Sequence, residues 1–269
     1  MIPKIIHYVW VGNNPKPKLV SDCIESWKKY CPDYEIVEWN DDILNKTDSA
    51  YVKEAYEHKK WAFVSDYIRL YALYHHGGFY FDTDLELTQN IDNFREHDFT
   101  MGLEIYDGNL GCQTAFIGAQ KQHKIISSLL KEYDNIHFVK DGKLDMTPNP
   151  KKFRQYFIKN YDTWDNNIKD KRITLENNVV IYPSHYFCIP QSDKENFAIH
   201  HFDGSWLEHY VRKTKLTIGK YALISIKTNS IVYKKGLKPN QESMIKSNER
   251  VIFKMKKSKN KTLFLIKKD

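Results

Sequence analysis

The sequence predicts an α/β fold with a mostly parallel central sheet. Segments with the apolar period of strands alternate with segments of helical period through the first half of the chain, which is typical of a parallel sheet covered by helices. The chain has 269 residues, enough for one large domain with a substantial core. Two aspartates, Asp82 and Asp84, directly follow an aromatic run that has the character of a strand.

The expected elements follow one another in a regular order. We expect strands at 2–11, 34–39, 78–82, near 98–104, near 112–118, at 178–182 and at 196–202. We expect helices at 18–30, across 50–76, at 121–133 and at 151–160. Residues 141–150 are polar and contain prolines, which predicts a loop over the site.

The helix ending at His76 has two charged residues of interest. Its apolar positions recur every three or four residues, and Gly77 and Gly78 end it. Asp66 and Arg69 lie three residues apart, so they share one face. They form either an exposed ion pair, worth little, or part of a site beside Asp82 and Asp84, because open sheets bind ligands at the carboxyl ends of their strands.

The Asp82-Thr83-Asp84 segment suits a hard divalent cation. At the end of a strand both carboxylates can reach one ion through oxygen ligands. Manganese also accepts imidazole nitrogen, and His200 and His201 lie in a short strand-like run. Neighbouring strand residues face opposite ways, so only one of the two histidines can reach the ion, and His200 is slightly favoured. A packed or exposed histidine pair is the alternative.

Three motifs carry a resemblance to a known family. Ser65-Asp66-Tyr67-Ile68-Arg69 followed by His76 to Asp84 resembles the sugar-binding DXD region of glycosyltransferase family 32. The spacing of the five polar positions in this region also resembles that of the glucosylating toxins: Asp66, Arg69, Tyr80, Asp82 and Asp84. Residues 2–12 are similar to the family's first strand, and residues 200–206 to its C-terminal Ser-Trp region.

The resemblance implies a GT-A fold, the Rossmann-like nucleotide-diphospho-sugar transferase fold with helices flanking a mostly parallel sheet. It implies a retaining hexosyltransferase with manganese or magnesium as cofactor and a nucleotide-sugar donor. The implied catalytic residues are Asp66, Arg69 and Asp82. The implied metal ligands are Asp82, Asp84 and His200 or His201. The implied donor-binding residues are Val9, Trp10, Asp66, Arg69, Tyr80, Asp82, Thr83, Asp84, Ser205 and Trp206.

One departure from the family pattern concerns the donor sugar. Family members often carry an asparagine in the strand that follows the metal motif. Gln113 or Thr114 takes that place in this sequence. The donor therefore stays open between a UDP-hexose and GDP-mannose.

Charge is distributed unevenly along the chain. Residues 212–269 carry 17 Lys and Arg against three acidic residues, a net charge of +14, whereas residues 1–211 have a net charge of −7. We therefore expect a catalytic domain at 1–211 and a basic extension at 212–269. Basic and apolar residues alternate in this extension, which indicates an anionic membrane surface or, as the alternative, solvated chain.

We expect the protein to be cytoplasmic and to associate peripherally with the inner face of the cell membrane. A helix needs about 20 consecutive apolar residues to span a bilayer, and no stretch of this sequence approaches that length. Residues 1–4 do not resemble the start of a signal peptide. No nucleic-acid-binding motif appears. The expected acceptor is a glycan, carried on a lipid in capsular polysaccharide or exopolysaccharide synthesis.

Two other functions compete with sugar transfer. A phosphatase of the haloacid-dehalogenase type also uses Asp-x-Asp, but near its N-terminus and with Thr or Val where this chain has Glu86. A non-catalytic nucleotide-sugar-binding or membrane-associated scaffold would use the same residues without turnover. An assay of sugar transfer separates the scaffold from the enzyme.

Overall fold

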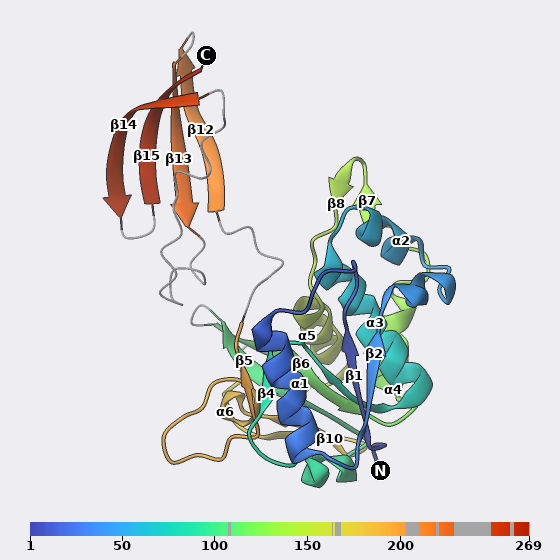
Figure 1. Cartoon of the computed structure of the whole chain (residues 1–269). Coiled ribbons are helices and arrows are strands. Elements are labelled where there is room, and N and C mark those ends of the chain that lie inside the picture. The colour runs from blue at the N-terminus through green and yellow to red at the C-terminus, as the bar shows by residue number, and fades with distance from the viewer. Residues whose placement is uncertain are drawn as a thin grey trace. The chain divides into compact units, whose positions relative to one another are not determined.

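The chain forms two compact units, Met1–His201 and Phe202–Asp269 (Figure 1). A computed structural model describes residues 1–106, 109–162, 164, 168–202, 210–218, 221–228, 249–258 and 261–268. The division falls shortly before the boundary that we drew from the charge distribution.

A seven-stranded sheet is the centre of the first unit. Its strands lie in the order β2-β1-β3-β6-β5-β10-β9. They are β1 (Ile5–Val9), β2 (Glu35–Trp39), β3 (Gly78–Phe81), β5 (Phe99–Tyr106), β6 (Asn109–Ala119), β9 (Ile173–Leu175) and β10 (Val179–Tyr182). From the strand pairings, β1, β2, β3, β5 and β10 point the same way, and β6 and β9 run against them. The predicted α/β class with a mostly parallel sheet is confirmed.

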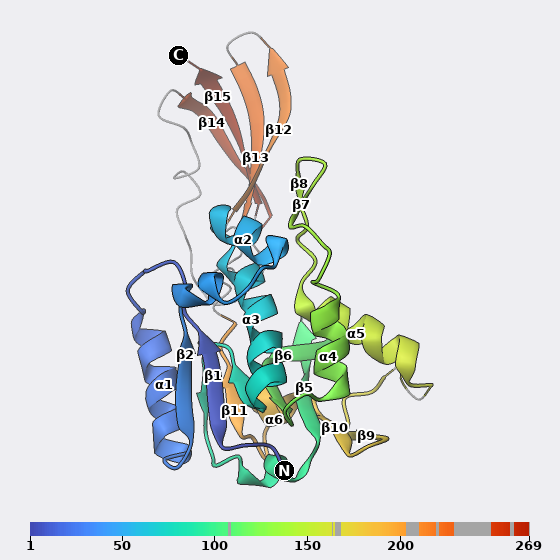
Figure 2. The same cartoon turned by 90° about the vertical axis from the view of Figure 1, so that its right-hand side faces the viewer.

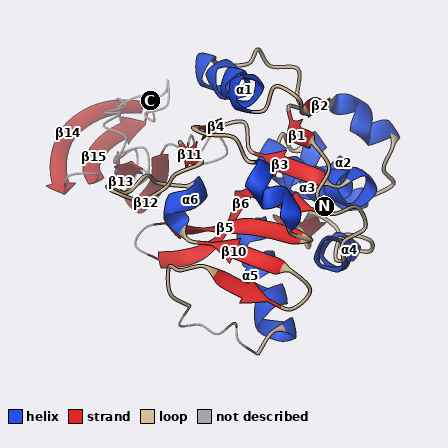
Figure 3. Ribbon diagram, turned by 90° about the horizontal axis from the view of Figure 1, so that it is seen from below, coloured by secondary structure: helices blue, strands red, loops and turns tan. Residues whose placement is uncertain are grey.

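Helices cover both faces of this sheet (Figures 2 and 3). They are α1 (Lys18–Tyr30), α2 (Ala50–Glu57), α3 (Trp61–His76), α4 (Lys124–Lys131), α5 (Asn149–Asn160) and α6 (Ser184–Phe187). Side chains alternate across β3: Tyr80 packs in the core with Ile68 of α3, whereas Phe79 and Phe81 pack in the core with Trp27 of α1. The two faces therefore have separate apolar cores.

A small two-stranded sheet lies beside the main one and joins distant parts of the chain. It pairs β4 (Leu85–Leu87) with β11 (Ala198–His200), antiparallel, with His200 opposite Leu85. The amide of His201 also donates to the carbonyl of Asp84 at 3.0 Å. This pairing holds the histidines next to the acidic pair.

Most of the longer elements match the sequence prediction. The helix at 18–30 is found at the expected residues, and the helical stretch across 50–76 divides into α2 and α3. Part of the expected loop at 141–150 is a hairpin of β7 (Val139–Lys140) and β8 (Lys143–Leu144), and α5 begins two residues early. The sequence did not predict β4, β9, α6 or the 3-10 turns Asp41–Asn45 and Asp92–Glu96, which are too short to show a period.

The second unit contains an antiparallel sheet in the order β12-β13-β15-β14. Its strands are β12 (Tyr210–Ile218), β13 (Tyr221–Thr228), β14 (Glu249–Ser258) and β15 (Lys261–Lys268). The sequence did not decide between strands and helices here.

Gly78 allows β3 to start against β1, and we expect its replacement to be costly. Its φ is +98°, and an added Cβ would lie 2.6 Å from the Ile5 carbonyl oxygen. Gly142 also has a positive φ, +71°, but open space around it. We predict that Gly78→Ala lowers the free energy of unfolding by about 2–4 kcal/mol, because strain and overlap add. Gly142→Ala should cost about 1 kcal/mol. Equal losses in urea unfolding would contradict the close approach of β1 and β3.

Candidate functional site

The acidic pair sits where β3 leaves the central sheet. The amide of Asp82 still donates to the Ala115 carbonyl on β6 (3.0 Å), and the Leu85 amide then closes a turn on the Asp82 carbonyl (3.0 Å). This turn holds Asp82, Thr83 and Asp84 at the sheet edge, all of them half-buried. The side chains of Asp82 and Asp84 are 27% and 15% exposed, so a ligand from solvent can reach both.

His200 completes a candidate metal site with these aspartates. One ligand atom from each of Asp82, Asp84 and His200 lies within 4.8 Å of the others. His200 Nε2 is 3.4 Å from Asp84 Oδ1. Burial lowers the pKa of His200, but the charges of Asp84 and Asp82 outweigh it and raise this pKa well above its ordinary value. Two carboxylates and an imidazole fit manganese or magnesium, and a bound cation would take the place of the imidazole proton.

His201 turns away from this group. Its Nε2 lies 2.9 Å from Glu86 Oε2. Both histidines were metal candidates from the sequence, and the structure brings only His200 to the aspartates. The reason is the alternation of side chains along an extended chain.

Arg69 lies buried between two carboxylates. Its Nη2 is 3.1 Å from Asp66 Oδ1 and 3.2 Å from Asp82 Oδ1, and the Arg69 side chain is 5% exposed. Its Nη1 donates to the Thr114 carbonyl (2.9 Å). The interpretation of Asp66 and Arg69 as an exposed surface pair is therefore wrong, because the pair is interior and holds the metal motif.

Tyr80 contacts the same oxygen of Asp82 as Arg69 does. Its hydroxyl donates to Asp82 Oδ1 at 2.9 Å, and the Arg69 guanidinium lies 4.6 Å from the centre of its ring. Tyr80 is 2% exposed. We predicted it as a donor-binding residue, and its position shows that it fixes Asp82.

Asp66 is held by Asn149, which is held in turn by Tyr133, and the sequence singled out neither residue. The amide of Asn149 donates to Asp66 Oδ2 (3.0 Å), and the Asn149 side chain donates to the Asp66 carbonyl (2.7 Å). Tyr133 in turn donates to Asn149 Oδ1 (2.8 Å). Burial raises the pKa of Asp66 to about 6, although Arg69 lowers it. The one sequence signal was Pro148 before Asn149, which marks a helix start but no contact.

Glu104 on β5 is a further carboxylate near His200. Its Oε2 is 4.0 Å from His200 Nδ1, whereas the other ring nitrogen of His200, Nε2, is the one nearest Asp84. Burial raises the pKa of Glu104 to about 7. Its sequence signal was a lone acidic residue within an apolar strand, which we did not use.

The other residues that we discussed for the donor site differ in how deeply they are buried. Val9 is buried at the end of β1, and Trp10 follows it half-buried, with its indole nitrogen donating to the Asn14 carbonyl (2.7 Å). The buried Gln113 side chain donates to the Phe187 carbonyl of α6 (2.5 Å). Ser205 and Trp206 lie outside the described residues.

Residues 17–100 match a family model described as a glycosyltransferase sugar-binding region containing a DXD motif. The matched stretch contains Asp66, Arg69, Tyr80, Asp82 and Asp84, the residues that the structure brings together. Residues 17–100 of this chain are thus similar to the sugar-binding DXD region of glycosyltransferases. The predicted resemblance is confirmed at that level. His200 and Glu104 lie outside the DXD region and join it through the tertiary structure.

Two known proteins resemble parts of the chain. Inositol phosphoceramide mannosyltransferase 3 of Schizosaccharomyces pombe is 33% identical over 98 residues, which are 34% of this chain and 26% of that protein. The chain therefore matches only about a quarter of that relative's length. The PaToxG glycosyltransferase structure is similar over 60% of this chain and 70% of its own, with 18% identity and a TM-score of 0.41, a likeness too slight to assign a fold.

Removing Arg69 should affect both stability and turnover. Arg69→Ala leaves Asp66 and Asp82 without their cation, so we predict a loss of about 3–5 kcal/mol in the free energy of unfolding. Nucleotide-sugar turnover should also fall strongly, because Asp82 is no longer held. Lys18→Ala is the control: Lys18 pairs with Asp22 on the surface of α1, 86% exposed, and its loss should be within error. Urea unfolding alongside initial rates tests this, and similar effects of the two changes would refute a structural role for the buried cation.

Proposed function

We propose that this chain is a metal-dependent retaining glycosyltransferase that moves a hexose from a nucleotide sugar to a glycan acceptor. The observation that carries the proposal is the convergence of Asp82, Asp84 and His200, with ligand atoms within 4.8 Å, next to the buried Arg69. Asp82 and Asp84 are the two aspartates of the DXD motif, which lies within the matched sugar-binding region, and His200 and Arg69 lie beside them. Two carboxylates and an imidazole that hold a divalent cation would suit a diphosphate leaving group, because the cation offsets its negative charge.

Asp82, Asp84 and His200 would hold the cation. Bound there, a divalent ion offsets the negative charge that develops on the diphosphate as the sugar bond breaks. Arg69 and Tyr80 keep Asp82 in place, so the ligand is oriented before substrate arrives. Water-mediated contact of Asp82 with the ribose is an alternative to direct ligation.

The donor would lie across the carboxyl ends of the strands. We assign the base to Val9 and the ring of Trp10, and the sugar hydroxyls to Asp66, with Thr83, Ser205 and Trp206 completing the donor site by resemblance. Arg69 would add hydrogen bonds through its planar fork. In a retaining transfer by front-face attack, the acceptor hydroxyl gives its proton to the departing phosphate, so no carboxylate nucleophile is required. The donor is a UDP-hexose or GDP-mannose.

The acceptor is proposed to be a lipid-linked glycan of capsular polysaccharide or exopolysaccharide synthesis. The net charge of +14 over residues 212–269 supports contact with an anionic membrane surface at its cytoplasmic face. The Schizosaccharomyces pombe relative is named an inositol phosphoceramide mannosyltransferase, which agrees with a lipid acceptor. Among the helices that the structure describes, none is long and apolar enough to cross a membrane.

Metal dependence is the direct test of the centre. We expect hydrolysis of nucleotide sugars, screened over UDP-hexoses and GDP-mannose, to require manganese or magnesium and to stop in excess chelator. Asp84→Asn should abolish turnover and leave the melting temperature nearly unchanged, because only a ligand oxygen is lost. Asp22→Asn, the same change on the exposed surface of α1, is the control. Full activity of the Asp84→Asn variant, or of the wild type in excess chelator, would refute the metal site. Nucleotide-sugar binding without turnover by the wild type would favour the non-catalytic scaffold.

Membrane attachment can be tested in the full-length chain. Replacing Lys254, Lys256 and Lys257 with Gln should weaken flotation with anionic vesicles, because each Lys near such a surface contributes about 1 kcal/mol. The same change at Lys28, Lys29 and Lys131, all exposed in the first unit, is the matched control. Binding should also fall as salt rises, since the attraction is screened within about 8–10 Å. Equal flotation of the two triple variants would remove the membrane from the proposal.

A further inference from the structure

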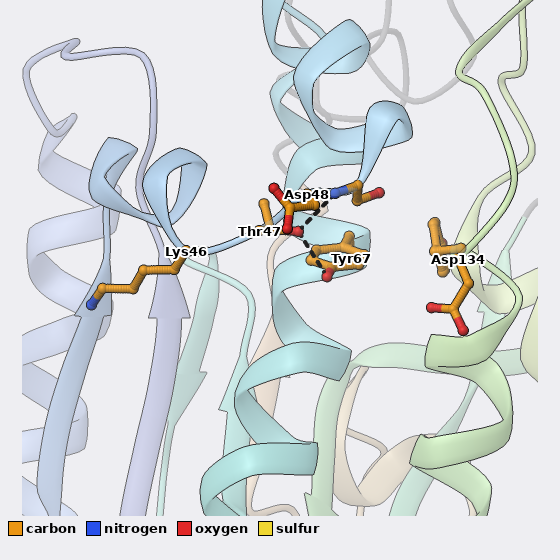
Figure 4. Close-up of a pocket in the computed structure, with 7 residues that line it drawn as sticks. Lys46, Thr47, Asp48, Tyr67 and Asp134 are labelled. Carbon is orange, nitrogen blue, oxygen red and sulfur yellow. Dashed lines mark hydrogen bonds between the residues drawn. The ribbon is translucent and has the colours of Figure 1, made fainter.

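One group of buried side chains supports the candidate metal site beside a cavity of about 340 Å³ (Figure 4). In the cavity lining, Thr47 Oγ1 donates to the Tyr67 hydroxyl at 2.9 Å. Tyr133 is 1% exposed, and Lys152 Nζ lies 4.7 Å from the centre of its ring. The Tyr133 hydroxyl donates to Asn149 at 2.8 Å. The lining of this cavity therefore belongs to the packing that holds Asn149 in place.

Residues Gln113, Thr114 and Ala115 of β6 form a second support, and each holds a different element. The Ala115 carbonyl accepts from the amide of Asp82 (3.0 Å). The Thr114 carbonyl accepts from Arg69 Nη1 (2.9 Å). Gln113 donates to α6 through its side-chain nitrogen Nε2. Because Gln113 acts through its side chain, a substitution can remove its contribution and leave the backbone of the strand intact.

The side-chain amide of Gln113 is fully enclosed. Gln113 is 0% exposed, and its Nε2 donates to the Phe187 carbonyl at 2.5 Å. The ring of Phe187 is itself fixed, because it stacks on Phe116 with 3.8 Å between the ring centres. Gln113 Oε1 is buried and has no hydrogen-bond partner among the residues that the structure describes. A buried amide with an unpaired oxygen is costly, so an apolar side chain of similar size would be favoured there unless the bond to Phe187 had a role.

The bond to Phe187 fixes the part of α6 that holds β11. The Tyr186 carbonyl accepts from the amide of Phe197 (2.8 Å). The Cys188 carbonyl accepts from the amide of His200 (2.9 Å). Phe187 lies between these two acceptors in the chain, and β11 pairs with β4 on its other edge. His200 is therefore held between β4 and the end of α6.

We propose that Gln113 is a positioning residue for His200 and acts through the end of α6. The role of His200 as a metal ligand rests on the proposed function. A ligand atom must lie within about 0.2 Å of its preferred distance from the ion, and residues that orient metal ligands typically contribute about 10–100-fold in affinity. Loss of the Gln113 bond lets α6, and β11 with it, move relative to Asp82 and Asp84. Gln113 itself is too deeply buried to contact the ion or the donor.

The test is binding of Mn²⁺ alone to the full-length protein, with free Mn²⁺ measured by electron paramagnetic resonance. Gln113→Met keeps the length of the side chain and removes its amide. We expect this variant to raise the dissociation constant about tenfold, the lower end of the range for residues that orient a ligand. Gln120→Met is the matched control, because the Gln120 amide donates to Asp98 Oδ1 (2.8 Å) at the start of β5, the sheet edge opposite the site. Its Mn²⁺ binding should equal that of the wild type.

A second background tests whether Gln113 acts through His200. His200→Ala removes the imidazole and leaves the two aspartates to bind Mn²⁺ more weakly. In this background Gln113→Met should have no further effect on the dissociation constant, because the side chain that it positions is gone. A loss of about tenfold in both backgrounds would show that Gln113 acts on another part of the site, and would overturn the proposal.

Wild-type Mn²⁺ binding by Gln113→Met would also overturn the positioning role, even if the melting temperature falls, and would leave the metal site standing. If Gln113→Met does not fold, Ser184→Ala takes its place, because it removes the bond from Ser184 Oγ to Asp170 Oδ2 (2.6 Å) at the other end of α6. Ser184→Ala should weaken Mn²⁺ binding severalfold, and unchanged binding would overturn the proposal.

Failure of the proposed function gives different results. A wild type that binds no Mn²⁺ would overturn the metal site and the role of Gln113 together. A loss of Mn²⁺ affinity in Gln113→Met that requires His200, in a protein that turns over no nucleotide sugar, would uphold the positioning role and refute the transferase.

Discussion

The buried guanidinium of Arg69 is the interaction on which the rest of the site depends. It lies between Asp66 and Asp82 with Nη2–oxygen distances of 3.1 and 3.2 Å. The carboxylate of Asp66 is buried and poorly solvated, and the guanidinium compensates its charge, since Arg69 lowers a pKa that burial raises. The Thr114 carbonyl accepts a hydrogen bond from the guanidinium, and the ring of Tyr80 packs against it. One aspartate of the metal motif thus has its orientation set by the protein core.

The other half of the site comes from the end of the first unit. β11 pairs with β4, which directly follows Asp84, and this pairing places His200 opposite Leu85. His200, a candidate metal ligand more than a hundred residues further along the chain, is therefore positioned by backbone hydrogen bonds. The DXD segment and His200 approach each other because two short strands share a sheet, whereas the arginine approaches through helix packing.

The sequence could predict the parts of this arrangement that have a local signal. The strand before Asp82, the helix with Asp66 and Arg69 and the Gly77-Gly78 turn all follow from period and turn chemistry. Tyr133 and Asn149 could not be found, because their contacts join elements far apart in the chain, and the one local signal of Glu104, an acidic residue in an apolar strand, does not identify its partner His200. The choice between His200 and His201 needed the register of β11, which a three-residue strand does not reveal. Ser205 and Trp206 stay predictions.

Carboxylates outnumber basic groups among the described residues at the site, which favours binding of a cation. Asp66, Asp82, Asp84 and Glu104 contribute four carboxylates, and among the residues that the structure describes Arg69 and His200 lie within ion-pair distance of them. Burial raises the pKa of Asp66 to about 6 and that of Glu104 to about 7, which shows how poorly this region solvates negative charge. A divalent ion between Asp82, Asp84 and His200 would relieve that excess, and a diphosphate would then find positive charge at the sheet edge. In the proposed reaction, this arrangement of carboxylates would give the ion, and through it the leaving group, one place to bind.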